Sequence, residues 1–276
     1  EEPRLRVATE KQLIDTCDRI IASTEREKGE LMQYYGAAPE TIGVVPCGVN
    51  LNLFKPRDQA KARYRLGFDQ NEGIVLYVGR FSPLKGIERL LEALTYLEHN
   101  PALRLVIIGG DGHHTPESQK LMRLAGERGV QHRVTFAGRI EQENLSTYYS
   151  AADVLAVPSH HESFGLVALE SLACGTPVVA TKVGAMELII REGETGYVLN
   201  NADPRLFATK IGSFISKEHK KRQSAEAIRA SVVQFSWSHI ANALIREYRA
   251  VIGRSDFSCS RDNSGKILPF RAAKTI

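Results

Sequence analysis

Short apolar runs alternate with longer amphipathic stretches between residues 74 and 199, and this alternation predicts a parallel sheet covered by helices. Most of the runs lack polar alternation, which is typical of strands buried on both faces. The expected strands are 42–45, 74–78, 103–108, 133–137, 153–157 and 177–180. The expected helices are 86–98, 116–128, 141–151, 165–174, 185–191, 204–216, 219–233 and 237–252. We therefore predict an α/β protein with a doubly wound, Rossmann-like parallel sheet.

Residues 1–41 have a different pattern: a helix, a strand-like run at 19–22 and a second helix near 25–35, which together would complete some other sheet. The run PCGVNLNLFKP (46–56) holds two prolines and a glycine and indicates a connector or an ordinary surface loop. The expected division is an incomplete N-terminal domain at 1–45, a connector at 46–57, a main domain at 58–233, a terminal helix at 234–252 and a flexible tail at 253–276.

Composition narrows the class of protein without identifying it. Of 276 residues, 43% are hydrophobic and 25% charged, which is a globular balance. The net charge of +4 is spread along the chain, so it favours an anionic ligand mildly and argues against nucleic-acid binding. The four cysteines are far apart and form no CxxC pair, so we expect no disulfide framework, no zinc site and a cytoplasmic location. The chain begins Glu1-Glu2-Pro3 without Met, and we expect it to be part of something longer.

The first candidate site is VGRFSPLKG (78–86), where an expected strand ends and a helix begins. Ligands of doubly wound folds bind beyond the carboxyl ends of the strands, so Arg80 and Lys85 would lie at the mouth of the sheet. The start of a helix adds free N–H groups and partial positive charge there, which suits a diphosphate. The order of residues excludes a P-loop, because Lys85 is not followed by Ser or Thr. The alternative is that both cations are ordinary solvated surface charges.

The second candidate is the run Gly109-Gly110-Asp111-Gly112 after the strand 103–108. It matches only part of a dinucleotide fingerprint, which argues against a nicotinamide-dependent dehydrogenase. We expect its glycines to let the backbone pass close to a bound nucleotide, and a plain turn is the alternative.

The third candidate is SHHESFGLVALESLACGTP (159–177), in which an apolar helix starts near Gly165. Glu162 lies in the loop before the helix, and Glu170 is an acid out of place in a buried helix. Glu170 lies about 7.5 Å beyond the helix start at Gly165, at a rise of about 1.5 Å per residue. The two acids could therefore bind different parts of one elongated ligand. The alternative is that Glu170 pairs with an internal arginine and Glu162 caps the helix. We interpret His160 and His161 as loop residues, because no carboxylate or Cys stands at ligand spacing.

In combination, these motifs resemble the nucleotide-binding half of the two-domain GT-B glycosyltransferases, specifically glycosyltransferase family 4, also called glycosyl transferases group 1. The resemblance runs from about residue 18 to 249 and rests on the motifs VPCGVNLNLFKP, VGRFSPLKG, IIGGDG, VTFAGRI, YYSAADVLAVPS, ESFGLVALESLACGTPVVAT and GETGYV. It implies that residues 1–41 are the last part of an N-terminal Rossmann-like domain that faces the acceptor. It also implies that the helix beginning at Trp237 crosses back onto that domain.

The resemblance implies a role for each matching residue. Arg80 and Lys85 would hold the donor diphosphate, Glu162 would contact the sugar hydroxyls and Glu170 the ribose hydroxyls, and the backbone of Ile140 would pair with the base. Arg80, Lys85 and Glu162 are expected to be catalytic. The family retains anomeric configuration and needs no metal, so we expect no cofactor and no metal site. The full expected donor-binding set is Gly79, Arg80, Lys85, Gly110, Arg139, Ile140, Glu162, Ser163, Phe164, Gly165, Leu166, Val167 and Glu170.

The expected function is transfer of a hexose from a nucleoside-diphosphate sugar to an unknown glycan, lipid or small-molecule acceptor in polysaccharide, glycolipid or glycoconjugate synthesis. We expect a UDP-sugar of the UDP-glucose type, with GDP-mannose left open because the base is read by backbone. The chain alone is expected to bind donor without turnover, since the acceptor-facing domain is missing. A nucleotide-sugar-binding module and an epimerase of the same fold are the alternatives. Peripheral contact with the inner face of the membrane is left open.

Overall fold

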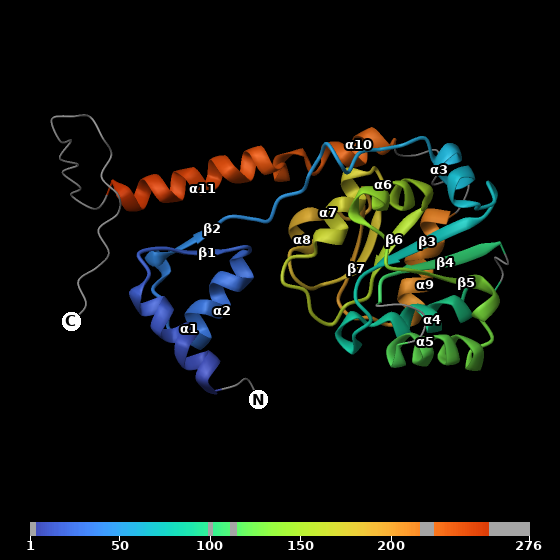
Figure 1. The fold of residues 1–276 in the computed structure, drawn as a ribbon, viewed down its shortest axis with the longest axis horizontal. Coiled ribbons are helices and arrows are strands. Elements are labelled where there is room, and N and C mark those ends of the chain that lie inside the picture. Colours follow the sequence, from blue (N-terminus) through green and yellow to red (C-terminus); the bar gives the residue numbers. More distant parts are fainter. Residues whose placement is uncertain (1–3, 99–101, 111–114, 216–223, 254–276) are drawn as a thin grey trace.

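The main body is a six-stranded parallel sheet in a computed structural model that describes residues 4–98, 102–110, 115–215 and 224–253 (Figure 1). The strand order is β5-β4-β3-β6-β7-β8, and every neighbouring pair is parallel. The chain runs outward from β3 to β4 and β5 and then returns to the other side of β3 for β6. The predicted doubly wound α/β fold is thus confirmed, with its topological switch point between β3 and β6. The bounds are β3 (Gly73–Val78), β4 (Leu103–Ile108), β5 (Val134–Gly138), β6 (Val154–Val157), β7 (Val178–Thr181) and β8 (Gly196–Leu199).

Helices cover both faces of this sheet (Figure 1). Successive side chains of β3 point to opposite faces, so that Leu76 packs in one hydrophobic cluster and Val75 and Tyr77 in the other. The Leu76 cluster takes in residues of α6 (Gln142–Ala151), α7 (Leu166–Ala173), α8 (Met186–Ile189) and α10 (Ala225–Ala230). The Tyr77 cluster takes in α4 (Ile87–Thr95), α5 (Pro116–Glu127) and α9 (Pro204–Ile215). Burial on both faces explains why the strands read as continuous apolar runs.

Some elements differ from the sequence prediction. Helix α3 (Gln59–Leu66) and the edge strand β8 were not predicted. The helix expected at 219–233 is found only as α10 and a 3-10 turn at Val233–Phe235, because Ser224 caps α10 and 216–223 lie outside the described residues. Asp111 and Gly112 of the glycine run and the tail from 254 onward are also outside the described residues. The expected domain boundaries stay a prediction.

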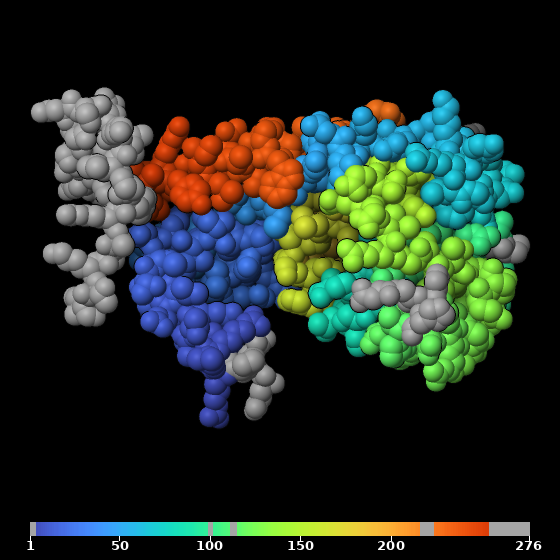
Figure 2. Space-filling model, viewed as in Figure 1, coloured from blue at the N-terminus to red at the C-terminus, as the bar shows by residue number. Residues whose placement is uncertain are grey.

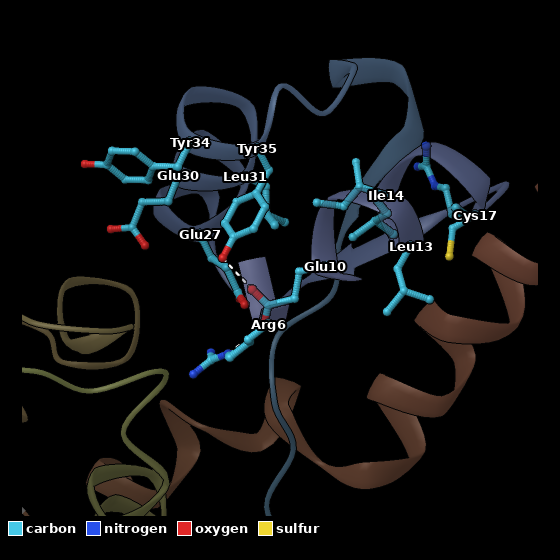
Figure 3. Close-up of a pocket in the computed structure, with 12 residues that line it drawn as sticks. Arg6, Glu10, Leu13, Ile14, Cys17, Glu27, Glu30, Leu31, Tyr34 and Tyr35 are labelled. Carbon is cyan, nitrogen blue, oxygen red and sulfur yellow. Dashed lines mark hydrogen bonds and ion pairs between the residues drawn. The ribbon is translucent and has the colours of Figure 1, made fainter. Parts of the chain in front are cut away.

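The N-terminal segment forms a separate small unit (Figure 1). Helix α1 (Arg4–Thr16), strand β1 (Ile20–Ala22), helix α2 (Glu25–Tyr35) and strand β2 (Ile42–Val44) build it, with β1 and β2 paired in parallel. Side chains of α1 and α2 line an open hollow of about 620 Å³, in which Tyr35 donates a hydrogen bond to Glu10 at 2.6 Å (Figure 3). A two-stranded sheet of this kind is marginal by itself.

Helix α11 (Trp237–Ile252) joins the two units, lying along the N-terminal segment (Figure 2). Arg19 and Glu247 form an ion pair at 2.7 Å between the N-terminal segment and α11. Where the connector passes the start of α11, a Cβ on Gly48 would lie 2.8 Å from the Trp237 ring, so the two segments touch without room for a side chain. None of the described helices has the length and apolar character that a membrane crossing requires.

Candidate functional site

A cation and an acid meet at the topological switch point. Strand β3 leads into the loop that carries Lys85, and its neighbour β6 leads into the loop that carries Glu162. Their side chains form an ion pair, with Lys85 Nζ 2.7 Å from Glu162 Oε1, and they are only 19% and 12% exposed. The backbone N–H of His160 donates to the carbonyl of Leu84 at 2.8 Å, which joins the two loops beside this pair. The geometry therefore brings together residues 77 positions apart in the sequence.

Glu162 is also held from behind by a buried hydroxyl. Ser159, which is 1% exposed, donates from Oγ to the same Glu162 oxygen at 2.8 Å. The carbonyl of Ser159 in turn accepts a hydrogen bond from the Thr181 hydroxyl at the end of β7. Among the described residues, the hydrogen bonds of Glu162 come from Lys85 and Ser159 and not from the N–H groups of α7, so the alternative role of Glu162 as a helix cap is not observed.

Arg80 lies two residues beyond the end of β3, and its side chain is exposed. Its carbonyl accepts a hydrogen bond at 3.1 Å from the hydroxyl of Tyr77, which is 2% exposed. Burial, together with the negative charges of Glu162 and Glu88, raises the pKa of Tyr77. The tyrosine therefore stays a neutral donor that fixes the backbone at Arg80, while the guanidinium side chain reaches solvent at the mouth of the sheet.

Two glycines let the loops at this edge approach closely. Gly109, at the end of β4, has φ of 132°, and a Cβ there would lie 1.8 Å from the carbonyl oxygen of Gly79. Gly165, at the start of α7, has φ of 105°, and a Cβ there would lie 2.4 Å from Met186 Cε. Both conformations disfavour any other residue. The N–H of Gly79 donates to the carbonyl of Ile108 at 3.0 Å, so its main chain is part of the sheet edge. The first N–H groups of a helix have no partner within it, so the amino end of α7 is available to a ligand.

The rest of the ESFGLV run surrounds the amino end of α7. Ser163 and Leu166 are exposed, Phe164 is buried and Val167 is half-buried. The carbonyl of Phe164 accepts a hydrogen bond from the N–H of Ala185 at 2.8 Å, which ties this loop to the start of α8. The run is thus anchored by its aromatic residue while its neighbours remain accessible.

Glu170 lies one turn into α7, and its partner is a tyrosine. The hydroxyl of Tyr149 on α6 donates to Glu170 Oε2 at 2.8 Å. Burial raises the pKa of Glu170, and hydrogen bonds from Tyr149 and Gln142 act in the opposite direction. The ion pairs of the described residues do not include Glu170, so the alternative pairing with an internal arginine is not observed among them. The acid is therefore held by neutral donors.

Arg139 and Ile140 follow β5 and line a depression of about 340 Å³ together with Tyr148 of α6. The next residue of α6, Tyr149, contacts Glu170. Helix α6 thus links the depression at Ile140 to the acid of α7. At the neighbouring strand end, Gly110 packs against the ring of Phe81.

Ser159 and Tyr149 had no predicted role, although both lie in the motif YYSAADVLAVPS. The signal that could have identified them is a hydroxyl group in an otherwise apolar, buried setting. Ser159 follows shortly after β6, and Tyr149 precedes the run SAADV. His160 and His161 are exposed, and no group of three His, Cys, Asp or Glu side chains in the described part of the chain is placed to hold a metal ion.

A doubly wound domain with a cation, an acid and a helix amino end at its switch point is the arrangement expected of the GT-B class. Residues 58–231 match the family described as Glycosyl transferases group 1, and the chain belongs to that family.

Known relatives agree with this assignment. The chain is 38% identical over 274 residues to the D-inositol 3-phosphate glycosyltransferase of Segniliparus rotundus, a match that covers 99% of this chain and 59% of that protein. Among solved structures, sucrose-phosphate synthase from Thermosynechococcus elongatus matches with a TM-score of 0.81 and 35% identity, over 92% of this chain and 63% of that one. Anabaena Alr3699/HepE in complex with UDP-glucose matches with a TM-score of 0.78 and 25% identity, over 89% of this chain and 68% of that one. The chain thus spans about three fifths of the curated relative's length.

Proposed function

We propose that this chain is the donor-binding part of a retaining, metal-independent glycosyltransferase of family 4 that takes a hexose from a UDP-sugar. The observation that carries the proposal is the Lys85–Glu162 ion pair at the switch point, next to the amino end of α7. A nucleoside-diphosphate sugar offers both groups a partner, because Lys85 can bind the phosphates and Glu162 the sugar hydroxyls. The match to a structure that contains UDP-glucose supports this choice of donor.

The proposed placement follows the strand order. The pyrophosphate lies between Arg80, Lys85 and the first N–H groups of α7, which together stabilise the negative charge of the leaving group. Glu170 binds the ribose hydroxyls, and the backbone at Ile140 binds the base in the depression that Tyr148 lines. In the transfer, the bond between sugar C1 and the β-phosphate oxygen breaks with both electrons leaving on the phosphate. The acceptor oxygen bonds to C1, and its proton passes to the departing phosphate.

For the acceptor, we propose a small phosphorylated polyol or sugar. The names of two relatives support this choice, one an inositol 3-phosphate glycosyltransferase and the other a sucrose-phosphate synthase. Acceptor contacts are expected from a domain beyond the donor-binding part. We therefore expect this chain by itself to bind donor and the longer protein to transfer the hexose.

Calorimetric titration with UDP, UDP-glucose, GDP and ADP tests the proposal on this chain. We expect the parent to bind UDP and UDP-glucose, and Lys85→Met to weaken both by roughly ten- to a hundredfold, because a charge-assisted contact contributes about 1.5–3 kcal/mol. Lys182→Met is the matched control, since the Lys182–Glu187 pair has the same 2.7 Å distance but is 51% and 59% exposed. A parent that binds none of these nucleotides, or a Lys85→Met variant that binds like the control, contradicts the proposal.

A second measurement separates donor binding from transfer. Release of UDP from UDP-glucose is followed with inositol phosphate or fructose 6-phosphate as acceptor, first with this chain and then with the longer protein. We expect turnover only with the longer protein. Turnover by this chain alone would show that the residues described above already include the acceptor site.

A further inference from the structure

Tyr149 is a buried hydroxyl group to which the proposed chemistry assigns no task. It is 0% exposed, and its ring packs edge-on against Phe54 with centroids 6.0 Å apart. Its carbonyl accepts a hydrogen bond from the Thr176 hydroxyl at 2.6 Å. Ring and main chain are therefore fixed independently of the hydroxyl. The hydroxyl itself donates to Glu170 Oε2 at 2.8 Å.

This contact, together with the hydrogen bond from Gln142, restricts the rotation of the Glu170 side chain. A glutamate side chain has several rotatable bonds, and fixing it at the moment of binding costs conformational entropy. A donor on one carboxylate oxygen removes part of that freedom beforehand. A carboxylate has about four lone-pair sites on its two oxygens, so Glu170 can accept from Tyr149 and Gln142 and still accept from a ligand.

We propose that Tyr149 is a positioning residue for nucleoside recognition: its hydroxyl holds one oxygen of Glu170 so that the carboxylate presents the other to a ribose diol. The inference rests on the proposed function, in which Glu170 binds the ribose. It goes further by assigning the orientation of that acid to a residue on the neighbouring helix.

The surroundings of Glu170 give the inference a pH-dependent consequence. Tyr149 and Gln142 on α6 face it with hydrogen-bond donors, and Cys174 lies near it on its own helix. Burial and the charge of Glu170 raise the pKa of Cys174, and the positive charges of Arg229 and Arg57 act against them and lower it. Burial raises the pKa of Glu170 and the Tyr149 hydrogen bond lowers it, so removing the hydroxyl raises this pKa further. The carboxylate that accepts the ribose hydroxyls is then lost at a higher pH than in the parent.

The test compares Tyr149→Phe with the parent in calorimetric titrations against UDP and 2′,3′-dideoxy-UDP, which lacks the diol. We expect roughly tenfold weaker binding of UDP, because a hydrogen bond to a charged group contributes about 1.5–3 kcal/mol and part of it remains. Binding of the dideoxy compound should be unchanged. Between about pH 5 and 8, the loss of UDP binding on acidification should begin at a higher pH in Tyr149→Phe. In a Glu170→Gln background, Tyr149→Phe should change neither affinity nor pH profile.

Tyr197→Phe is the control, a tyrosine packed against Phe214 at the β8 end of the sheet. Its binding of both nucleotides should equal that of the parent. If Tyr149→Phe weakens the binding of UDP and of the dideoxy compound equally, the role of Tyr149 is merely structural and the inference is overturned. The inference is also overturned if the variant binds UDP with the same affinity and pH profile as the parent. A parent that binds no UDP would overturn the proposed function, and the inference with it. Thermal unfolding of Tyr149→Phe checks that the variant is folded. The ratio of the affinities for UDP and the dideoxy compound, measured against pH in the parent, tests Glu170 without any substitution.

Discussion

Replacing Glu162 by Gln separates the two partners that compete for Lys85. In the structure, the ammonium group of Lys85 is neutralised by Glu162 at 2.7 Å. In the proposed function, a free nucleoside diphosphate must share Lys85 with this acid, and it meets the negative charge of Glu162 as it binds. A nucleotide sugar meets the same charge, but its hydroxyls then donate to the carboxylate. Glu162→Gln should therefore strengthen binding of UDP and reduce the advantage of UDP-glucose over UDP.

The expected size follows from the charges. Two unit charges 4 Å apart interact by about 1 kcal/mol in water and about 4 kcal/mol near a protein surface. Side chains that are 19% and 12% exposed lie between these limits, and counter-ions screen part of the effect. A gain of about 1–2 kcal/mol, or roughly five- to thirtyfold in the Kd of UDP, is expected. The ratio of the UDP and UDP-glucose affinities should shift by at least about tenfold, because the sugar loses a charge-assisted acceptor.

The assay is calorimetric titration of both ligands into the parent, Glu162→Gln and Glu187→Gln. Glu187 is the acid of the pair with Lys182, so its substitution removes the same charge from a side chain that is 59% exposed. Raising the salt concentration should narrow the difference in UDP affinity, since screening weakens the repulsion that the substitution removes. Weaker UDP binding by Glu162→Gln than by the parent would refute the reasoning, because Glu162 would then assist the diphosphate and not compete with it.

Three further substitutions test the scaffold and the second acid. Arg63→Met should lower the free energy of unfolding in urea by about 3–5 kcal/mol, because it removes the cation that faces Asp153 where both side chains are 2% exposed. Gly165→Ala should lower the thermal unfolding midpoint, at a cost of about 1–3 kcal/mol, since φ is 105° and the added Cβ lies 2.4 Å from Met186 Cε. Glu170→Gln should raise the midpoint at neutral pH and weaken UDP binding. Folding raises the pKa of the Glu170 carboxyl group. Protonated Glu170 therefore contributes its full stabilisation only below the pKa of the unfolded chain. That contribution is lost as pH rises through the pKa of the folded protein.

Each of these three variants has a control within the chain. Arg65→Met removes an exposed arginine from the same helix as Arg63, Gly29→Ala adds a methyl group where nothing lies within 4 Å, and Glu187→Gln replaces an exposed acid. An Arg63 variant as stable as the Arg65 variant would show that the buried pair contributes nothing. If Gly165→Ala and Gly29→Ala had the same thermal unfolding midpoint, the predicted backbone strain at Gly165 would be contradicted. A Glu170 variant whose midpoint is below that of the parent would contradict the pKa argument.

Periodicity predicted the sheet because its strands are buried on both faces, which leaves an unmistakable apolar run for β3 and β4. The same periodicity did not predict helix α3. Its sequence QAKARYRL has no apolar stripe, and only Ala62 and Arg63 are buried. The helix is stabilised instead by the Asp58 cap and by the ion pair of Arg63 with Asp153, 90 residues away. Strand β8 (GYVL) is short and starts with glycine, so no local pattern distinguishes it from a turn.

The site was partly predictable for a related reason. The carboxyl ends of parallel strands lie at one edge, so sequence alone placed the Lys85 and Glu162 loops together there. That the two side chains form an ion pair depends on β3 and β6 being neighbours, with Val75 opposite Val154, which is a property of topology. The contact of Tyr149 with Glu170 depends in the same way on how α6 packs against α7.

The two acids of the site are held in opposite ways, and the difference bears on turnover in the proposed function. Glu162 is paired with a cation, so its charge is compensated before any ligand arrives. When the hexose leaves, Glu162 loses its sugar partners while Lys85 still holds the phosphates, and the re-formed pair competes with the bound diphosphate. Glu170 has only neutral donors and would keep its ribose partner throughout. In the proposed function, Glu162 therefore discriminates the nucleotide sugar from the nucleoside diphosphate product, whereas Glu170 binds both equally. An interaction that is equal in two states shifts no equilibrium between them, so of these two acids Glu162 is the one that can favour product release.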